Sequence, residues 1–202
     1  MEYDEIRLKK YQERLQMMLE AFDIFCKGSG LQCFLVGGSA LGAERHGGFI
    51  PWDDDIDIAM TREDFEKMEE LMSARNDSLD AFTHSHVERS LIPESPVGRL
   101  YDLDSSKDGV THAPKIDVHP IDGVPEKKLS RKLQKISALI YYLGIYHLPT
   151  KNKGRAAHII SKVLLKVTPD CLWKIILKKC KKYFTKWNLD DAENICSLFG
   201  VA

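Results

Sequence analysis

Apolar residues recur at helical spacing along the first 27 residues of this chain and alternate with polar residues in several later segments. The first pattern predicts an amphipathic helix over residues 4–27, with its large apolar side chains on one face. These side chains are Ile6, Tyr11, Leu15, Met18, Leu19, Phe22 and Phe25. The apolar run 33–38 predicts a buried strand that ends in a Gly-Gly turn, and residues 39–46 predict a short helix with Ser39 near its N-cap.

The rest of the pattern alternates between strands and helices before it becomes helical throughout. Period-2 alternation predicts strands at 54–60, 81–87, 97–103 and 115–121. Helical spacing predicts helices at 62–75, near 128–146, 154–166 and 170–188. Thr61 is expected to cap the first of these helices. This order predicts an α+β fold, in which a mixed β-sheet flanked by helices is followed by a helical C-terminal portion.

Charge divides the chain into two halves of opposite sign, although the net charge is only −1. Residues 127–186 contain 16 Lys and Arg and a single acid, Asp170, whereas the remaining residues are strongly acidic. The apolar ending NICSLFGVA has no cap, which indicates that the C-terminal region is truncated or divergent.

The cysteines and the N-terminus bear on where the protein works. The five cysteines are odd in number and scattered, and they form no CxxC pair, so we expect buried, reduced thiols. The charged start MEYDEIRLKKYQ does not resemble a signal peptide, and no apolar run reaches 18 residues. We therefore expect a cytoplasmic protein.

An acidic cluster in residues 53–57 is the strongest chemical signal. Asp55 and Asp57 should share one face of a strand, because side chains alternate along it, while Ile56 and Ile58 face the other way. Carboxylates at this spacing can bracket divalent ions in phosphoryl transfer, and Mg²⁺ prefers carboxylates together with phosphate oxygens. The simpler interpretation is a solvated acidic edge, but the apolar neighbours argue against it, because unpaired buried carboxylates are costly.

A Gly-Gly-Ser turn upstream of the acids strengthens the phosphate interpretation. Gly37 and Gly38 allow backbone N–H groups to approach a phosphate, Ser39 adds a hydroxyl, and the following helix points its positive end there. No Gly-Lys-Ser/Thr follows, so the turn is not a Walker loop. Alone the turn is a weak signal, and it becomes specific through the acid-hydrophobe-acid strand downstream.

The order of these elements resembles the nucleotidyltransferase superfamily of the polymerase β type: a strand, Gly-Gly-Ser, a short helix and then Asp55-Ile56-Asp57-Ile58. More narrowly, one long stretch is similar to the LicD family, which includes phosphocholine transferases and the fukutin-related proteins. This stretch reads FLVGGSALGAERHGGFIPWDDDIDIAMTREDFEKM. A second block, KIDVHPIDGVP at 115–125, is similar to a later motif of the same family. The resemblance implies a nucleotidyltransferase-like catalytic core at residues 1–126 and a separate basic helical region at 127–202.

The resemblance also implies roles for individual residues. Asp55, Asp57 and Asp117 would hold metal, with Asp117 as third ligand or general base toward an acceptor hydroxyl. The substrate and phosphate contacts would come from Gly37, Gly38, Ser39, Arg45, His46 and Trp52. For Trp52 plain packing is an equal alternative to stacking on a base. Arg99 would contact a phosphate or form a salt bridge, Asp53 would lie behind the metal ligands, and Asp54 would fix the turn.

The activity that the resemblance implies is Mg²⁺-dependent, with Mn²⁺ as the alternative ion. Phosphocholine or a similar phospho-alcohol would move from a CDP-activated donor, CDP-choline first among them, to a hydroxyl of a cell-surface glycan such as teichoic acid or lipopolysaccharide, and CMP would leave. The family's C-terminal acceptor-side segment with a Tyr-Gly-Asp-like stretch is missing here, and Glu44 replaces a small apolar residue. The first departure weakens the assignment of the acceptor.

Two other function classes remain. A nucleotidyltransferase that moves NMP from an NTP to a small molecule or RNA would share the glycine and Asp-x-Asp elements, but the stretch SALGAERHGG lacks the Arg-Asp pair of tRNA-end enzymes, so we expect no nucleic acid. A non-catalytic binding domain would have no reason to keep three costly acids. The basic half suits an anionic membrane at the inner face or a polyanionic glycan.

Overall fold

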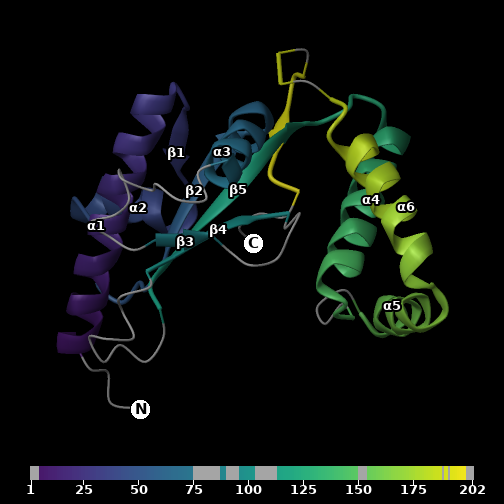
Figure 1. Ribbon diagram of the computed structural model, residues 1–202, viewed down its shortest axis with the longest axis horizontal. Coiled ribbons are helices and arrows are strands. Elements are labelled where there is room, and N and C mark those ends of the chain that lie inside the picture. Colours follow the sequence, from purple (N-terminus) through teal and green to yellow (C-terminus); the bar gives the residue numbers. More distant parts are fainter. Residues whose placement is uncertain are drawn as a thin grey trace. The chain divides into compact units, whose positions relative to one another are not determined.

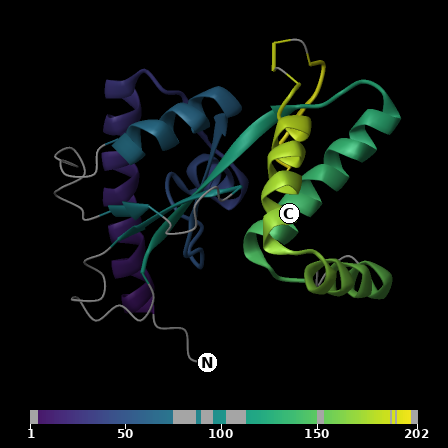
Figure 2. The ribbon, with the colours of Figure 1, turned by 45° about the vertical axis from the view of Figure 1, so that its right-hand side comes forward.

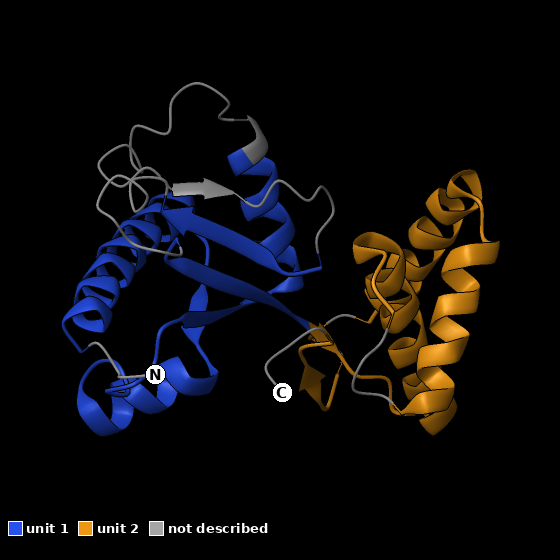
Figure 3. Cartoon of the chain, turned by 90° about the horizontal axis from the view of Figure 1, so that it is seen from below, with its two compact units in different colours: residues 1–121, 200–202 blue, residues 122–199 orange. Residues whose placement is uncertain are grey.

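The computed structural model describes residues 5–74, 87–89, 96–102, 113–149, 154–187, 189–190 and 192–198. The chain divides into two compact units, and each is described by itself below (Figure 3). Unit 1 contains residues 1–121 and 200–202, and unit 2 contains residues 122–199. The boundary expected after residue 126 separates a catalytic core from a basic helical region. This division by function stays a prediction.

Unit 1 is the α+β part of the chain, as the sequence predicts (Figure 1). Its helices are α1 (Glu5–Ser29), α2 (Gly37–His46) and α3 (Arg62–Ala74). Its strands are β1 (Cys33–Leu35), β2 (Ile56–Thr61), β3 (Val87–Arg89), β4 (Gly98–Asp102) and β5 (Lys115–Gly123), the last of which runs on into unit 2. The expected strand 81–87 lies outside the described residues except for its last position.

The sheet is mixed, with strand order β1-β2-β5-β4-β3. Strands β2 and β5 are parallel, whereas β1 with β2, β5 with β4, and β4 with β3 are antiparallel. Two central parallel strands therefore lie side by side although about 60 residues separate them in the chain. This neighbourhood brings the two sequence motifs together.

One face of the sheet carries the hydrophobic core. Ile56, Ile58 and Met60 of β2 and Ile116 and Val118 of β5 are buried in one cluster with apolar side chains of α1 and α3. Figure 2 shows both helices alongside the sheet. Burial of this kind contributes about 1.5–3 kcal/mol per large side chain. The alternate positions of both strands consequently point to the other face, where the acids lie.

The boundaries of two helices test the sequence-based caps. Thr61 caps α3 as predicted, because the Asp64 backbone N–H donates to Thr61 Oγ1 at 3.1 Å and the Thr61 hydroxyl donates to Asp64 Oδ2 at 3.0 Å. The helix predicted at 39–46 begins two residues earlier, since α2 begins at Gly37 and its N-cap is Val36, without a side-chain cap, and Ser39 lies in the first turn. Gly37 can begin the helix from a positive φ of 57°, a conformation that favours glycine.

Unit 2 is helical, with α4 (Lys128–Tyr146), α5 (Arg155–Val167) and α6 (Asp170–Phe184), and it ends in β6 (Ile195–Cys196). The two residues of β6 pair with Asp122 and Gly123 at the end of β5. Helices α4 and α6 lie side by side, and α5 lies across one end of the pair (Figures 1 and 2). All three predicted helices are confirmed, although α6 ends four residues before the predicted boundary.

The close approach of α4 and α6 depends on a glycine and a buried amide. A Cβ on Gly144 would lie 2.7 Å from Trp173 Cε3 and 2.8 Å from Leu177 Cδ2, so only glycine fits without a shift. The buried Gln134 side chain donates to the carbonyls of Gly123 and Phe184, at 2.8 and 3.1 Å. It thereby satisfies backbone groups at the end of β5 and of α6.

All five cysteines are free. The expectation that they are buried holds at Cys26 alone, since Cys33, Cys180 and Cys196 are partly buried and Cys171 is exposed. None of the described helices combines the length and apolar character that crossing a membrane would require.

Candidate active site

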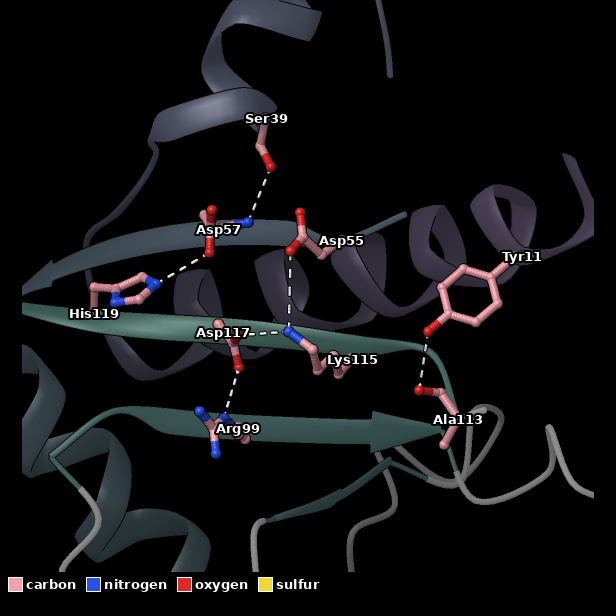
Figure 4. A network of polar contacts seen from close by, with 9 residues as sticks. All are labelled: Tyr11, Ser39, Asp55, Asp57, Arg99, Ala113, Lys115, Asp117 and His119. Carbon is pink, nitrogen blue, oxygen red and sulfur yellow. Dashed lines mark hydrogen bonds and ion pairs between the residues drawn. The ribbon is translucent and has the colours of Figure 1, made fainter. Parts of the chain in front are cut away.

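The centre of the polar face is a pair of aspartates on neighbouring strands. Asp57 of β2 and Asp117 of β5 are direct partners in the parallel register, so their side chains leave the same face at the same level. Arg99 of β4 is the register partner of Asp117 on the other side. Arg99, Asp117 and Asp57 therefore form a row across three adjacent strands (Figure 4).

Strand β5 contributes two further polar side chains to this face. Lys115, Asp117 and His119 occupy alternate positions and point to one side of the sheet (Figure 4). Lys115 Nζ lies 2.6 Å from Asp117 Oδ2, and Arg99 Nε lies 3.1 Å from Asp117 Oδ1. His119 Nε2 lies 3.0 Å from Asp57 Oδ1. Each acid of the central pair is thus held by at least one nitrogen-bearing side chain.

Asp55 lies one residue before β2, and its charge is only partly compensated. Lys115 Nζ is 4.0 Å from Asp55 Oδ2, which is the outer limit of an ion pair. Burial and, after it, repulsion from Asp57 raise the pKa of Asp55, and Lys115 only partly opposes this. Burial lowers the pKa of Lys115, but the hydrogen bond to Asp117 and the charges of Asp117 and Asp55 outweigh it and leave that pKa raised. The site therefore holds more negative charge than its own cations neutralise.

The Gly-Gly-Ser turn is bonded directly to the backbone of Asp57. The Asp57 N–H donates to Ser39 Oγ at 2.9 Å, and the Asp57 carbonyl accepts from the Val36 N–H at 3.0 Å. Ser39 thus fixes the turn beside the acids, and its hydroxyl hydrogen is left for another acceptor. The turn and the acidic strand belong to one site, as the spacing predicts.

Gly38 and Asp53 approach each other closely, which gives Asp53 a definite place. A Cβ on Gly38 would lie 2.7 Å from Asp53 Oδ2. The Asp53 carbonyl accepts from Gln12 Nε2 of α1 at 2.8 Å, and the Asp53 N–H donates to the Ile50 carbonyl at 2.9 Å. The loop that carries the acids is therefore anchored to α1 and α2.

A second grouping of acids competes with the predicted one. In the part of the chain that the structure describes, Asp53, Asp54 and Asp55 offer carboxylate oxygens within 4.8 Å of one another. The predicted set of Asp55, Asp57 and Asp117 does not form such a group here, and Lys115 lies between Asp55 and Asp117. Only Asp54 of these three acids is exposed, and we keep the predicted set because Asp57 and Asp117 lie on the rigid sheet.

Three other predicted residues are exposed. Arg45 and His46 are exposed in the last turn of α2, about 9 and 10.5 Å along the helix axis from Ser39. The Trp52 side chain is 70% exposed, so core packing, one of the two interpretations of this residue, does not apply. The substrate contacts proposed for all three stay predictions.

The sequence alone did not predict four residues of this region: Lys115, His119, Gln12 and Tyr11. Alternation along Lys115-Ile-Asp117-Val-His119 is a signal that could have found the first two. No local signal marks Tyr11, whose hydroxyl donates to the Ala113 carbonyl at 3.0 Å. Burial, followed by the charges of Asp54 and Asp55, raises the pKa of Tyr11 to about 12. Arg99 forms the salt bridge that was one of its two predicted alternatives.

The set of side chains suits binding of a hard divalent cation and an anionic substrate. Asp55, Asp57 and Asp117 offer the oxygen ligands that Mg²⁺ prefers, and the turn at Gly37–Ser39 offers backbone N–H groups at a helix N-terminus. His119 orients Asp57 in the way that side chains behind a metal ligand commonly do. The arrangement can therefore bring a phosphate group and a cation together.

Comparison with known proteins adds an independent observation. A family model described as LicD/FKTN/FKRP, nucleotidyltransferase domain, matches residues 30–135. The matched range contains the Gly-Gly-Ser turn, both acidic strands and Arg99.

Individual relatives cover less of the chain. The lipopolysaccharide cholinephosphotransferase LicD of Haemophilus influenzae is 44% identical over 50 residues, which are 25% of this chain and 19% of that protein. The ribitol 5-phosphate transferases FKRP of Mus musculus and Homo sapiens are 33% identical over 102 residues, which are 50% of this chain. The match spans 19% of either FKRP protein, so about a fifth of each of these relatives is compared.

Proposed function

Because this chain belongs to the LicD/FKTN/FKRP nucleotidyltransferase family, we propose that it transfers phosphocholine or a similar phospho-alcohol from a CDP-activated donor to a hydroxyl of a cell-surface glycan. CMP would be the leaving group. CDP-choline is our first choice of donor, and a lipopolysaccharide or teichoic acid is our choice of acceptor. The named activities of the relatives, which transfer cholinephosphate and ribitol 5-phosphate, support a phospho-alcohol donor in general.

The observation that carries the proposal is the register of Asp57 with Asp117, beside a Gly-Gly-Ser turn bonded to the backbone of Asp57. Phosphoryl transfer needs little covalent chemistry from the protein, and its catalysis consists mainly of positioning and charge stabilisation. A rigid sheet that fixes two acids next to a phosphate-binding turn supplies both. A binding domain without chemistry would gain nothing from the excess negative charge.

The residues present fit a divalent cation, Mg²⁺ first and Mn²⁺ as the alternative. Asp55, Asp57 and Asp117 would hold it, since their oxygens are the preferred hard ligands and their charge exceeds that of the neighbouring cations. When bound, the ion would supply charge neutralisation for the donor phosphates and the transition state. Lys115 lies where such an ion would need room, so we expect its ammonium group to move toward the donor phosphates.

The other groups would bind and orient the substrates. The N–H groups at the start of α2 and the free hydroxyl hydrogen of Ser39 would donate to a donor phosphate. Both oxygens of Asp117 already accept hydrogen bonds, from Arg99 and Lys115, and the second lone pair on each oxygen could take the acceptor proton. Arg99 would meanwhile hold the Asp117 carboxylate in a fixed orientation.

A thermal-shift screen tests the proposal. The chain is heated with Mg²⁺ and one of CDP-choline, CDP-ribitol, CDP-glycerol, CTP or ATP, and with each nucleotide without metal. A bound donor at a hundredfold excess over its Kd stabilises the fold by about 2.7 kcal/mol. We expect a selective, Mg²⁺-dependent response to one CDP-alcohol, and loss of that response in Asp57→Asn.

Two results would overturn the proposal. A selective response to CTP or ATP would favour transfer of NMP from an NTP to a small molecule or RNA. A response to none of the five nucleotides, from a chain with a normal circular dichroism spectrum, would favour a domain that does not bind nucleotides.

A further inference from the structure

Helix α5 exposes its most apolar face to solvent. Five large aliphatic side chains of this helix are exposed: Ile159, Ile160, Val163, Leu164 and Val167. They recur at i, i+1, i+4, i+5 and i+8, which places them on one side of the helix. The position that α5 buries is Ser161, at 4% exposure, and its hydroxyl donates to the His158 carbonyl within the helix. The usual orientation of an amphipathic helix is thus reversed.

The charges of α5 border this apolar face. Arg155, Lys162 and Lys166 follow i, i+7 and i+11 spacing and form one stripe, and the helix contains no acid. The surrounding sequence has the same sign, since residues 127–186 contain 16 basic residues and one acid. A surface that combines large aliphatic side chains with a cationic border fits a partner that is both apolar and anionic.

From this combination we propose that α5 is an interfacial helix that docks unit 2 on an anionic lipid membrane. The 13 residues of α5 span about 20 Å, and helices of this kind lie in the plane of the interface with their apolar face about 5–10 Å deep. Arg155, Lys162 and Lys166 then reach the anionic headgroups, with their aliphatic stems along the apolar face. The inference concerns other residues than those of the carboxylate site and does not depend on the proposed transfer reaction.

Charge complementarity favours a membrane over a protein partner. The field of an anionic bilayer acts on every cationic residue near it, at either end of α5 and on neighbouring helices alike. A protein partner would instead need acids matched to each of them. Helix α5 contains no acid, and residues 127–186 contain a single one. Such an almost uniformly basic segment matches an extended anionic surface.

The test is cosedimentation of the full chain with vesicles of phosphatidylcholine alone and of phosphatidylcholine mixed with phosphatidylglycerol, at low and high salt. We expect binding to the anionic vesicles and its release at high salt, because screening shortens the reach of exposed charges. The variant Ile159→Gln, Val163→Gln, Val167→Gln should bind more than about tenfold more weakly. Glutamine favours helices at least as well as Ile and Val, so circular dichroism should show an unchanged fold.

A matched control changes as much apolar surface on another helix of the same unit. Leu129, Leu133 and Ile136 of α4 are also exposed, and their triple change to Gln should leave vesicle binding within about twofold of the parent chain. An equal loss in both triple variants would overturn the assignment to α5. Equal binding to neutral and anionic vesicles, or binding to neither, would overturn the proposal and favour a protein partner, a second copy or a soluble polyanionic glycan.

Discussion

Lys115 and Asp117, two residues apart on one strand, form an ion pair of 2.6 Å in the middle of an acidic site. The same ammonium group reaches Asp55 at 4.0 Å. Lys115 thus occupies the space between two of the three proposed metal ligands and supplies positive charge to both. The strand carries its own counter-ion, and a divalent cation would have to compete with it.

Replacing Lys115 by Met should strengthen Mg²⁺ binding. The substitution keeps the side-chain length and removes the competing charge, so we expect Mg²⁺ to bind several-fold to about tenfold more tightly by titration calorimetry. Without metal, the variant should unfold at a lower temperature, since the acids lose a counter-charge. Lys67→Met, on α3 with its ammonium bound to the Ser29 carbonyl, is the control and should change neither quantity. Unchanged Mg²⁺ affinity in Lys115→Met would show that Lys115 and the ion do not share a site.

Asp55→Asn should abolish metal-dependent turnover while the fold survives. At neutral pH and without metal, its melting temperature should be equal to or higher than that of the parent chain, because the cost of burying a charged carboxylate and its repulsion from Asp57 are both removed. Asp54→Asn makes the same charge change at an exposed neighbour and should retain turnover. If Asp54→Asn were inactive and Asp55→Asn active, the consecutive acids and not the strand face would hold the ion.

The stability difference of Asp55→Asn should depend on pH with a defined sign. The pKa of Asp55 is raised in the folded chain, so the folded state binds this proton more tightly than the unfolded state does. The favourable contribution of this proton to the stability of the folded chain is complete below pH 3.8, the ordinary pKa of an aspartate. It is lost as the pH rises through the raised pKa of Asp55. Melting curves from pH 3 to 8 should therefore show a higher melting temperature for Asp55→Asn than for the parent chain at the upper end alone. A higher melting temperature of the variant at pH 3 would contradict the raised pKa of Asp55 as the cause.

His119→Phe should weaken the metal site without unfolding the sheet. His119 Nε2 is bonded to Asp57 Oδ1 at 3.0 Å, and the register partner of His119 is the small residue Ala59. Loss of a side chain that orients a metal ligand commonly reduces metal affinity by about 10–100-fold. Calorimetry should show this loss, and His119→Gln, which retains a donor, should recover part of the affinity. Equal affinity in the Phe variant and the parent chain would remove the orienting role.

Gly42→Ala should destabilise unit 1 and disturb the acidic loop. A Cβ there would lie 2.5 Å from the Gly48 carbonyl oxygen and 2.9 Å from the Ile50 nitrogen, and both are backbone atoms that cannot rotate away. We expect a cost of about 1–3 kcal/mol in urea unfolding. Gly28→Ala is the matched control, since nothing lies within 4 Å of its added Cβ in α1, and it should be neutral or slightly stabilising. Equal stability of the two variants would mean that the loop adapts.

Local pattern was sufficient for most elements, whereas the roles of the acids stay predictions. Alternation predicted that Asp55 and Asp57 share a face, and the Gly-Gly-Ser turn was placed beside them from spacing alone. The start of α2 was missed because Gly37 enters the helix from a left-handed conformation, which glycine adopts without a sequence signal of its own. Exposed Cys171 was missed because hydropathy does not tell which side of a basic helix faces inward.

The family, the α+β order of the elements, the acidic strand and the basic half can be predicted from sequence, because each depends on motifs or patterns within short stretches of the chain. Four facts require the three-dimensional fold: Asp57 faces Asp117, Lys115 lies between the acids, His119 holds Asp57, and α5 turns its aliphatic side outward. These facts depend on strand register and helix rotation. Both are set by the burial of Ile56, Ile58, Ile116 and Val118 against α1 and α3 and by the packing of α4 on α6, which join residues distant in sequence.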